Sequence, residues 1–111
     1  MKERQYQRAK SWKLPHAVHY QCIWLIRDME RLRVLAANPE PSPAAAEARF
    51  RLDCIQLALQ EVPEFYRDGI IGNIRGERSG YGEHAHLNTW KRWKQIFLYE
   101  LALDLRLIAP D

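Results

Sequence analysis

Lysine, arginine and glutamine side chains gather near the start of the last helical segment, where they could bind a polyanion. Residues 87–108 read LNTWKRWKQIFLYELALDLRLI, without glycine or proline, and Asn88 is placed to cap the first turn. At 100° per residue, Lys91, Arg92 and Gln95 share one face. Arginine pairs with guanine and glutamine with adenine in the major groove of DNA. The segment therefore predicts either a DNA-reading helix or an ordinary amphipathic helix with a solvated basic face.

The opposite side of this segment and most of its C-terminal half are apolar, which predicts that the helix is anchored in a core. Glu100 and Asp104 lie between the apolar stripes, and a structural pair bound to arginines such as Arg31, Arg33 or Arg67 is expected. A catalytic dyad is the less favoured interpretation. One stripe holds Trp90, Trp93, Phe97, Leu101, Leu105 and Ile108, and the other holds Ile96, Leu103 and Leu107.

The remaining reactive side chains form no catalytic or metal-binding motif. His16, His19 and Cys22 stand at steps of three on one expected helix face, but zinc needs a fourth ligand and a closed spacing. No nucleophile–base, phosphate-loop or CxxC motif is present. Cys22 and Cys54 fall at core-like positions and are expected to be reduced, buried thiols. We therefore expect no enzyme, no metal and no cofactor.

Charge is spread unevenly along the 111 residues, a length that predicts a single domain. The overall formal charge is +3, yet residues 1–35 carry +5, residues 36–74 carry −3 and residues 75–111 carry +1. Such separation favours a surface with one polyanion-binding side. The chain has neither an apolar run long enough for a membrane span nor the apolar segment of a secretion signal. A cytoplasmic protein without a membrane partner is expected.

Residues 1–14 form a basic arm in which Tyr6 and Trp12 lie between the cations. Such an arm can neutralise phosphates, through Lys10 and Lys13 among others, and stack its rings on bases or sugars. Alternatively, the two aromatic side chains dock on the core. Both interpretations remain open.

Two helices with matching apolar spacing are expected ahead of the last segment. The first runs from about Pro15 to Ala36, and the second from about Ala44 to Glu61 after a proline-rich connector. Ser42 and Pro43 predict the N-cap and first residue of the second helix. The shared four–three spacing predicts an antiparallel hairpin, or a dimer interface. The stripe positions are Val18, Cys22, Leu25, Met29, Leu32 and Ala36, then Ala48, Leu52, Ile55, Leu59 and Val62.

A third, weaker helix is expected from Glu64 to about Ile74, after Pro63. Its two glycines each disfavour helix by about 1 kcal/mol relative to alanine, so packing must stabilise it. A glycine-rich loop follows at residues 76–82, and Glu83 to His86 predict one short helical turn.

The C-terminal part of the chain resembles a sigma-factor region-4-type helix-turn-helix. VPEFYR at 62–67 is similar to the start of the first helix, YGEHA at 81–85 to the short scaffold helix, and NTWKRWK at 88–94 to the head of the recognition helix. Behind the arm RAKSW and a helix ending IRDMERL, this spacing resembles the RinA/ArpU type of phage late-gene activators of Gram-positive bacteria. The resemblance covers most of the chain. It implies sequence-specific DNA binding and control of phage packaging or structural genes, with RNA polymerase as a candidate further partner.

We therefore predict an all-α fold, in which the hairpin of residues 15–61 packs on a helix-turn-helix-like unit at residues 62–111. The predicted function is a non-enzymatic, DNA-binding transcriptional regulator that acts on double-stranded DNA. Lys91, Arg92 and Gln95 are the expected contacts to base edges. The expected contacts to the DNA backbone are Thr89, Lys94, Arg75, Arg78, Lys10 and Lys13.

Two other functions remain open. The hairpin can mediate homodimerisation or bind a partner helix, which makes the chain a protein-interaction module. An RNA-binding helical protein is a third interpretation, because Trp90, Trp93 and Tyr81 lie near basic residues. A steep loss of affinity with salt distinguishes a nucleic-acid binder from a protein-interaction module.

Overall fold

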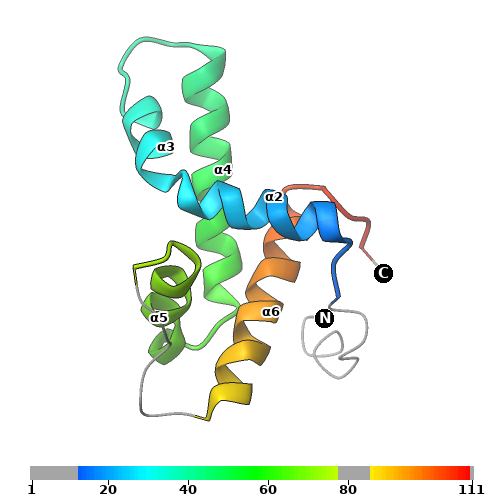
Figure 1. Cartoon of the computed structure of the whole chain (residues 1–111). Coiled ribbons are helices and arrows are strands. Elements are labelled where there is room, and N and C mark those ends of the chain that lie inside the picture. Colours follow the sequence, from blue (N-terminus) through cyan, green and yellow to red (C-terminus); the bar gives the residue numbers. More distant parts are fainter. Residues whose placement is uncertain (1–12, 78–85, 111) are drawn as a thin grey trace.

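The computed structural model describes residues 13–77 and 86–110, which hold five helices and no strand (Figure 1). The predicted all-α class is thus confirmed. No helix in these two ranges is both long and apolar enough to cross a membrane. The helices are α2 (His16–Arg27), α3 (Met29–Ala36), α4 (Pro43–Gln60), α5 (Glu64–Ile74) and α6 (Leu87–Asp104).

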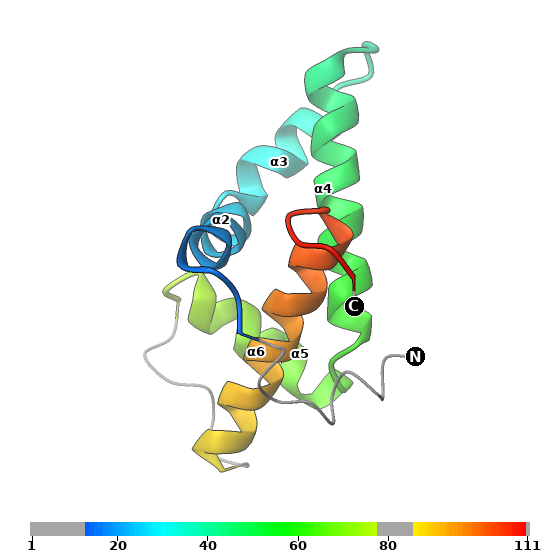
Figure 2. The same ribbon diagram turned by 90° about the vertical axis from the view of Figure 1, so that its right-hand side faces the viewer.

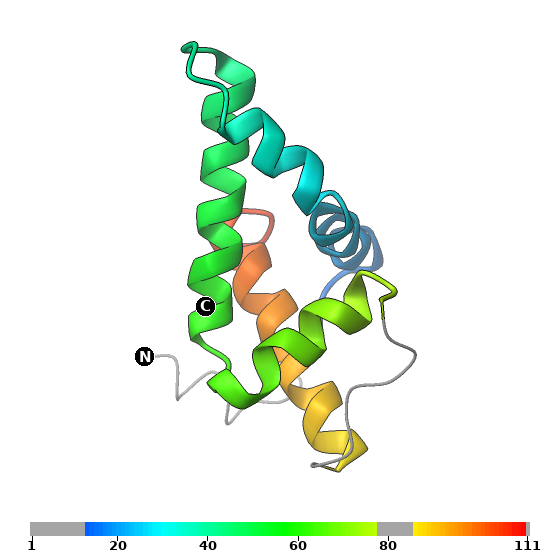
Figure 3. The same cartoon turned by 90° about the vertical axis from the view of Figure 1, so that its left-hand side faces the viewer.

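The first predicted helix is divided in two at Asp28, which contradicts the expectation of one helix from Pro15 to Ala36. Asp28 leaves helical geometry, with φ −94° and ψ 7°, and its carboxylate accepts hydrogen bonds from Arg31. Aspartate has a low intrinsic helix propensity, so a break at this position costs little. As a result α2 and α3 point in different directions (Figure 3).

The predicted antiparallel hairpin is formed by α3 and α4, while α2 crosses the pair formed by α4 and α6 (Figures 1 and 2). The expected cap of α4 is confirmed. Ser42 Oγ accepts a hydrogen bond from the backbone N–H of Ala45 at 3.0 Å, and Pro43 is the first helical residue. Arg49 then ties α4 to the end of α3 by donating to the carbonyl of Ala36.

One hydrophobic cluster draws on all five helices and centres on α6. Phe97 and Leu101 are fully buried, as expected, and Ile55 of α4 packs in the same cluster. Leu25 belongs to the predicted apolar stripe but is only half-buried, whereas its neighbour Ile26 is fully buried. A strict heptad stripe drifts from the buried face of a straight helix, and the break at Asp28 shifts it further. Other buried members are Cys22, Met29, Cys54, Ala58, Val62, Ile70 and Ile74.

Glu100 is also fully buried on α6. Arg31, Arg33 and Arg67 were expected to pair with this carboxylate. In the structure, each of the three binds another group. Arg31 binds Asp28 and Arg33 binds Glu30. Arg67 donates from Nε to a backbone carbonyl, that of Val62, at 2.8 Å.

Two helices end in the same hydrogen-bonded motif. After α5, Gly76 has φ 77°, and the N–H of Glu77 bonds the carbonyl of Gly72 at 2.9 Å. After α6, Arg106 takes the same left-handed conformation, with φ 63°, and the N–H of Leu107 bonds the carbonyl of Ala102. This is the Schellman motif, which satisfies otherwise unpaired carbonyls at a helix end. The last helix therefore stops at Asp104, short of the predicted Ile108.

The N-cap of α6 also differs from the prediction. His86, rather than Asn88, precedes the first helical residue, and its Nδ1 accepts a hydrogen bond from the N–H of Asn88 at 3.2 Å. Asn88 is itself inside the helix. The helix thus begins two residues earlier than asparagine, the better capping residue type, indicates.

Both cysteines are free, buried thiols, as predicted. Burial raises the pKa of Cys22 to about 12, and burial followed by the charges of Asp104 and Asp53 raises that of Cys54. Because the thiolate is the reactive form, a maleimide at pH 8 should modify both thiols far more slowly in the native protein than in urea. Mass spectrometry of timed samples measures this. Equal rates in both conditions would contradict the buried placement.

Candidate nucleic-acid interface

Aromatic rings fasten the first half of α6 to α5. The ring of Tyr66 lies 4.7 Å from that of Trp90, edge to face, and 6.2 Å from that of Trp93, nearly parallel. Phe65 adds a contact of 6.0 Å to Trp90. Edge-to-face and offset arrangements are the favourable ones for aromatic pairs. These contacts fix the rotation of α6, and therefore which residues of its first turns face solvent.

The opposite face of the same turns is basic and exposed. Lys91 and Arg92 are exposed, while Thr89 and Gln95 are partly buried. Within the described ranges, neither Lys91 nor Arg92 takes part in an ion pair. The turns that carry them project at one end of the molecule, beyond α5 (Figures 1 and 3). The predicted division into a buried aromatic side and an exposed basic side is thus present.

Lys94 lies differently from the exposed pair. It is half-buried, and its Nζ donates to Asn73 Oδ1 of α5 at 3.0 Å. Burial, then the charges of Arg27 and Lys91, lower the pKa of Lys94 below its ordinary value. Lys94 is therefore a cation held at the α5–α6 junction.

The crossing of α2 over α6 adds two side chains that the sequence pattern did not single out for this surface. Arg27 donates from Nε to the carbonyl of Ile74 at 2.8 Å, and its guanidinium lies 5.1 Å from the centre of the Trp24 ring. Burial, then the charges of Lys94 and His16, lower the pKa of His19 below its ordinary value. We call His19, Arg27, Lys91 and Lys94 the junction cluster.

The other predicted contacts to the DNA backbone are placed less favourably or lie elsewhere. Arg75 is mostly buried, and its guanidinium pairs with Glu30 at 3.6 Å and with Glu77 at 3.4 Å. Lys13 is exposed ahead of α2. Lys10 and Arg78 lie outside the described residues.

The relation of α5 to α6 is looser than in a compact helix-turn-helix, where the turn has three or four residues. Here α5 ends at Ile74 and α6 begins at Leu87. The predicted short turn at Glu83 to His86 lies outside the described residues, except for His86. In the described part, the shared hydrophobic cluster, the aromatic contacts and the bond between Lys94 and Asn73 link the two helices.

Histidine, cysteine and carboxylate side chains do not gather into a metal site within residues 13–77 and 86–110. Comparisons with protein-family models, with curated proteins and with solved structures find no match to this chain. The resemblance to RinA/ArpU-type regulators therefore stays a prediction.

Proposed function

We propose that this protein is a sequence-specific DNA-binding transcriptional regulator that reads double-stranded DNA with the first turns of α6. The observation that carries the proposal is the placement of Lys91 and Arg92. Both are exposed at a projecting helix end whose rear is fixed by the rings of Tyr66 and Trp90. Recognition helices of DNA-binding motifs enter the major groove in this way, with their first turns toward the bases.

In this proposal, Arg92 and Lys91 contact base edges, and Gln95 follows one turn later on the same face. Arginine suits O6 and N7 of guanine because it can donate two parallel hydrogen bonds. Thr89 and the other members of the junction cluster, His19, Arg27 and Lys94, then lie beside the flanking phosphates, which position the helix without reading sequence. The cations of the junction cluster come from both α2 and α6, so the DNA backbone bridges two helices.

A phage or prophage origin, and contact with RNA polymerase, belong to the same proposal and rest on the resemblance alone. The RNA-binding alternative loses part of its support. Trp90 is only 4% exposed and Trp93 is half-buried, so neither offers a free ring face of the kind that stacks on RNA bases. The protein-interaction alternative has support of its own from an exposed aromatic groove, described below.

Selection from a pool of random duplexes tests the proposal. The folded protein should enrich a defined motif at low salt. The variant Lys91→Glu with Arg92→Glu should enrich none, because both cations that face the bases are reversed. Circular dichroism on both samples ensures that folding is equal. Failure of the folded wild-type protein to enrich any motif would contradict the proposal.

DNA affinity should rise as the pH falls below 6.5, the ordinary imidazole value, owing to His19. Burial and the charges of Lys94 and His16 keep its pKa lower in the free protein, so His19 takes up its proton there at a lower pH than an ordinary imidazole. A phosphate beside it favours the imidazolium, and binding takes up a proton. Fluorescence anisotropy across pH 5.5–7.5 measures this, and His19→Gln should weaken the dependence.

His19 affects folding stability in the opposite direction: stability falls as the pH falls, whereas DNA affinity rises. A depressed pKa in the native state means that the unfolded chain binds the proton more readily. The stability contributed by neutral His19 is therefore complete above pH 6.5 and is lost as the pH falls through its native pKa.

Unchanged pH dependence of DNA binding in His19→Gln would show that this imidazole does not face the phosphates.

A further inference from the structure

An open groove lined by three aromatic side chains lies between α2, α4 and the turn after α6. Tyr20, Trp24 and Phe50 are 46%, 61% and 48% exposed. The groove has a volume of about 590 Å³, and Leu105 and Leu107 also line it. A large aromatic side chain buries ~150–250 Å² when covered, so the three exposed parts together amount to roughly 300 Å². Apolar patches of this size on a protein surface are often functional.

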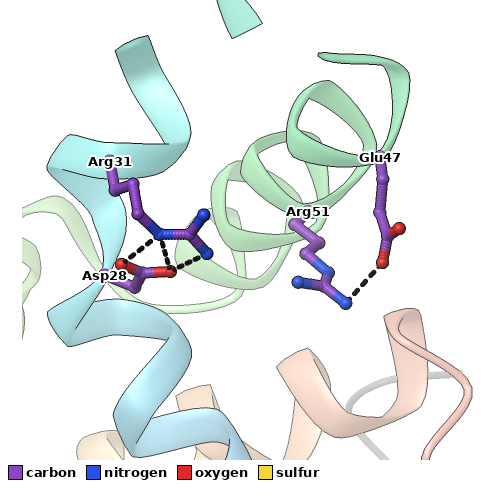
Figure 4. Close-up of polar contacts among 4 residues, drawn as sticks. All are labelled: Asp28, Arg31, Glu47 and Arg51. Carbon is purple, nitrogen blue, oxygen red and sulfur yellow. Dashed lines mark hydrogen bonds and ion pairs between the residues drawn. The ribbon is translucent and has the colours of Figure 1, made fainter. Parts of the chain in front are cut away.

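Two ion pairs lie at the groove, in which Asp28, Glu47 and Arg51 line it and Arg31 pairs with Asp28 beside it (Figure 4). Asp28 binds Arg31 at 2.6 Å on the α2–α3 side, and Glu47 binds Arg51 on α4. The hydrogen bond from Arg31, then the charges of Arg31 and Arg51, outweigh burial and lower the pKa of Asp28. The positive charge of Arg51 on α4 thus acts on the Asp28 carboxylate across the groove. All four side chains are at least 35% exposed, so another molecule can reach them.

We propose that this groove is the interface of a two-fold symmetric homodimer, with a second copy of the chain as its occupant. In a two-fold interface the same patch meets itself, so the patch has to be complementary to itself. The two ion pairs at the groove sum to zero charge and offer both signs, which lets Glu47 of one copy approach Arg51 of the other. A strongly acidic or basic partner would instead face as many like charges as opposite ones.

The composition of the groove fits the centre of such an interface. Tyrosine and tryptophan are the residue types enriched where binding energy concentrates, and a polar rim surrounds them. Two copies would bring together six aromatic rings of roughly 600 Å², and the rim supplies the rest of the ~1,200–2,000 Å² of a stable interface. The hairpin stripes that the sequence offered for dimerisation are not available, because Met29, Leu32 and Ile55 are buried within the chain.

The groove and the basic turns of α6 are at opposite ends of that helix. Leu105 follows its last residue, whereas Lys91 lies in its second turn. A helix of 18 residues is about 27 Å long. A dimer through the groove therefore leaves both basic faces uncovered. This last point rests on the proposed function: such a dimer would read a palindromic site, as symmetric regulators do.

Sedimentation of the full-length chain without DNA tests the dimer separately from DNA binding. Wild-type protein should be dimeric at about 100 µM, ~100-fold above a micromolar dissociation constant. Phe50→Glu should raise the dissociation constant at least about 30-fold, as expected for a central aromatic contact. Phe50 is chosen because it lies on α4, away from the junction cluster. Trp24→Ala is the second variant, and it should weaken the dimer in the same direction.

Val34→Glu is the matched control, since Val34 is 73% exposed on α3 and does not line the groove. It should leave the dimer intact, and circular dichroism should show equal helix content in all variants. A monomeric wild-type protein would overturn the proposal, and so would equal weakening by Phe50→Glu and Val34→Glu. A monomer whose groove binds an amphipathic helical peptide would assign the groove to a foreign partner instead. If the dimer is present but no duplex is enriched, the DNA-binding proposal alone fails.

Discussion

Truncating Ile55 to alanine should lower the free energy of unfolding by about 2–5 kcal/mol, the range found for deleting a fully buried isoleucine. Ile55 has no exposed surface and packs in the cluster that joins all five helices. Its removal leaves a cavity where α4 meets α6, and close-packed neighbours can refill such a space only in part. Urea denaturation followed by circular dichroism measures the loss.

Leu57 provides the control for this prediction. It stands two residues further along α4 but is 53% exposed, so Leu57→Ala should change the free energy of unfolding by less than about 0.5 kcal/mol. The m-value should stay the same in both variants, so that a change in midpoint reports stability. Similar losses at the two positions, or a loss below about 0.5 kcal/mol at Ile55, would refute the packing of α4 described above.

Replacing Arg92 by alanine should weaken binding to the selected duplex by about 1–3 kcal/mol and relax the choice of base at one position. The reason is that a bidentate arginine carries specificity as well as charge. Loss of a phosphate contact would instead weaken all sequences about equally. Anisotropy titrations against the selected duplex and its single-base variants separate the two effects.

Arg49→Ala is the matched control for Arg92→Ala. It removes the same charge near the other end of the molecule, where the guanidinium binds the carbonyls of Ala36 and Asn38. Its affinity for the selected duplex should stay within about twofold of the wild-type value, because the side chain lies at the α3–α4 end of the molecule, away from the first turns of α6 (Figure 1). Equal weakening by both substitutions would mean that binding reports net charge and not a contact by Arg92.

Local signals were enough to predict much of the fold. Ser42 and Pro43 set the start of α4, and Pro63 sets that of α5, because capping and proline geometry act within a few residues. The left-handed turn at Arg106 could not be predicted, since that conformation favours glycine and nothing in the residue type indicates it. It depends on the packing of Leu105 and Leu107 against the rest of the chain.

The candidate site also has features that the sequence predicts and features that it does not. The exposure of Lys91 and Arg92 follows from helical periodicity. Trp90 and Phe97 bury one side of α6, and the two cations lie on the other side. The approach of Arg27 to Lys94 could not be predicted. It arises where α2 crosses α6, and such long-range placement leaves no trace in the spacing of either segment. The break at Asp28, which ends α2 directly after Arg27, was also missed.

The dependence of duplex affinity on salt is the most direct test of DNA binding by α6. It should be measured for the wild-type protein and for Lys91→Glu with Arg92→Glu, both shown to be folded. For the wild-type protein, the logarithm of the association constant should fall linearly with the logarithm of salt concentration, by about 0.9 for each phosphate neutralised. The double variant should lose most of the affinity, because the cations that face the bases are reversed, and should flatten the slope, because its net charge is four units lower. Equal affinities and slopes for the two proteins would contradict the account.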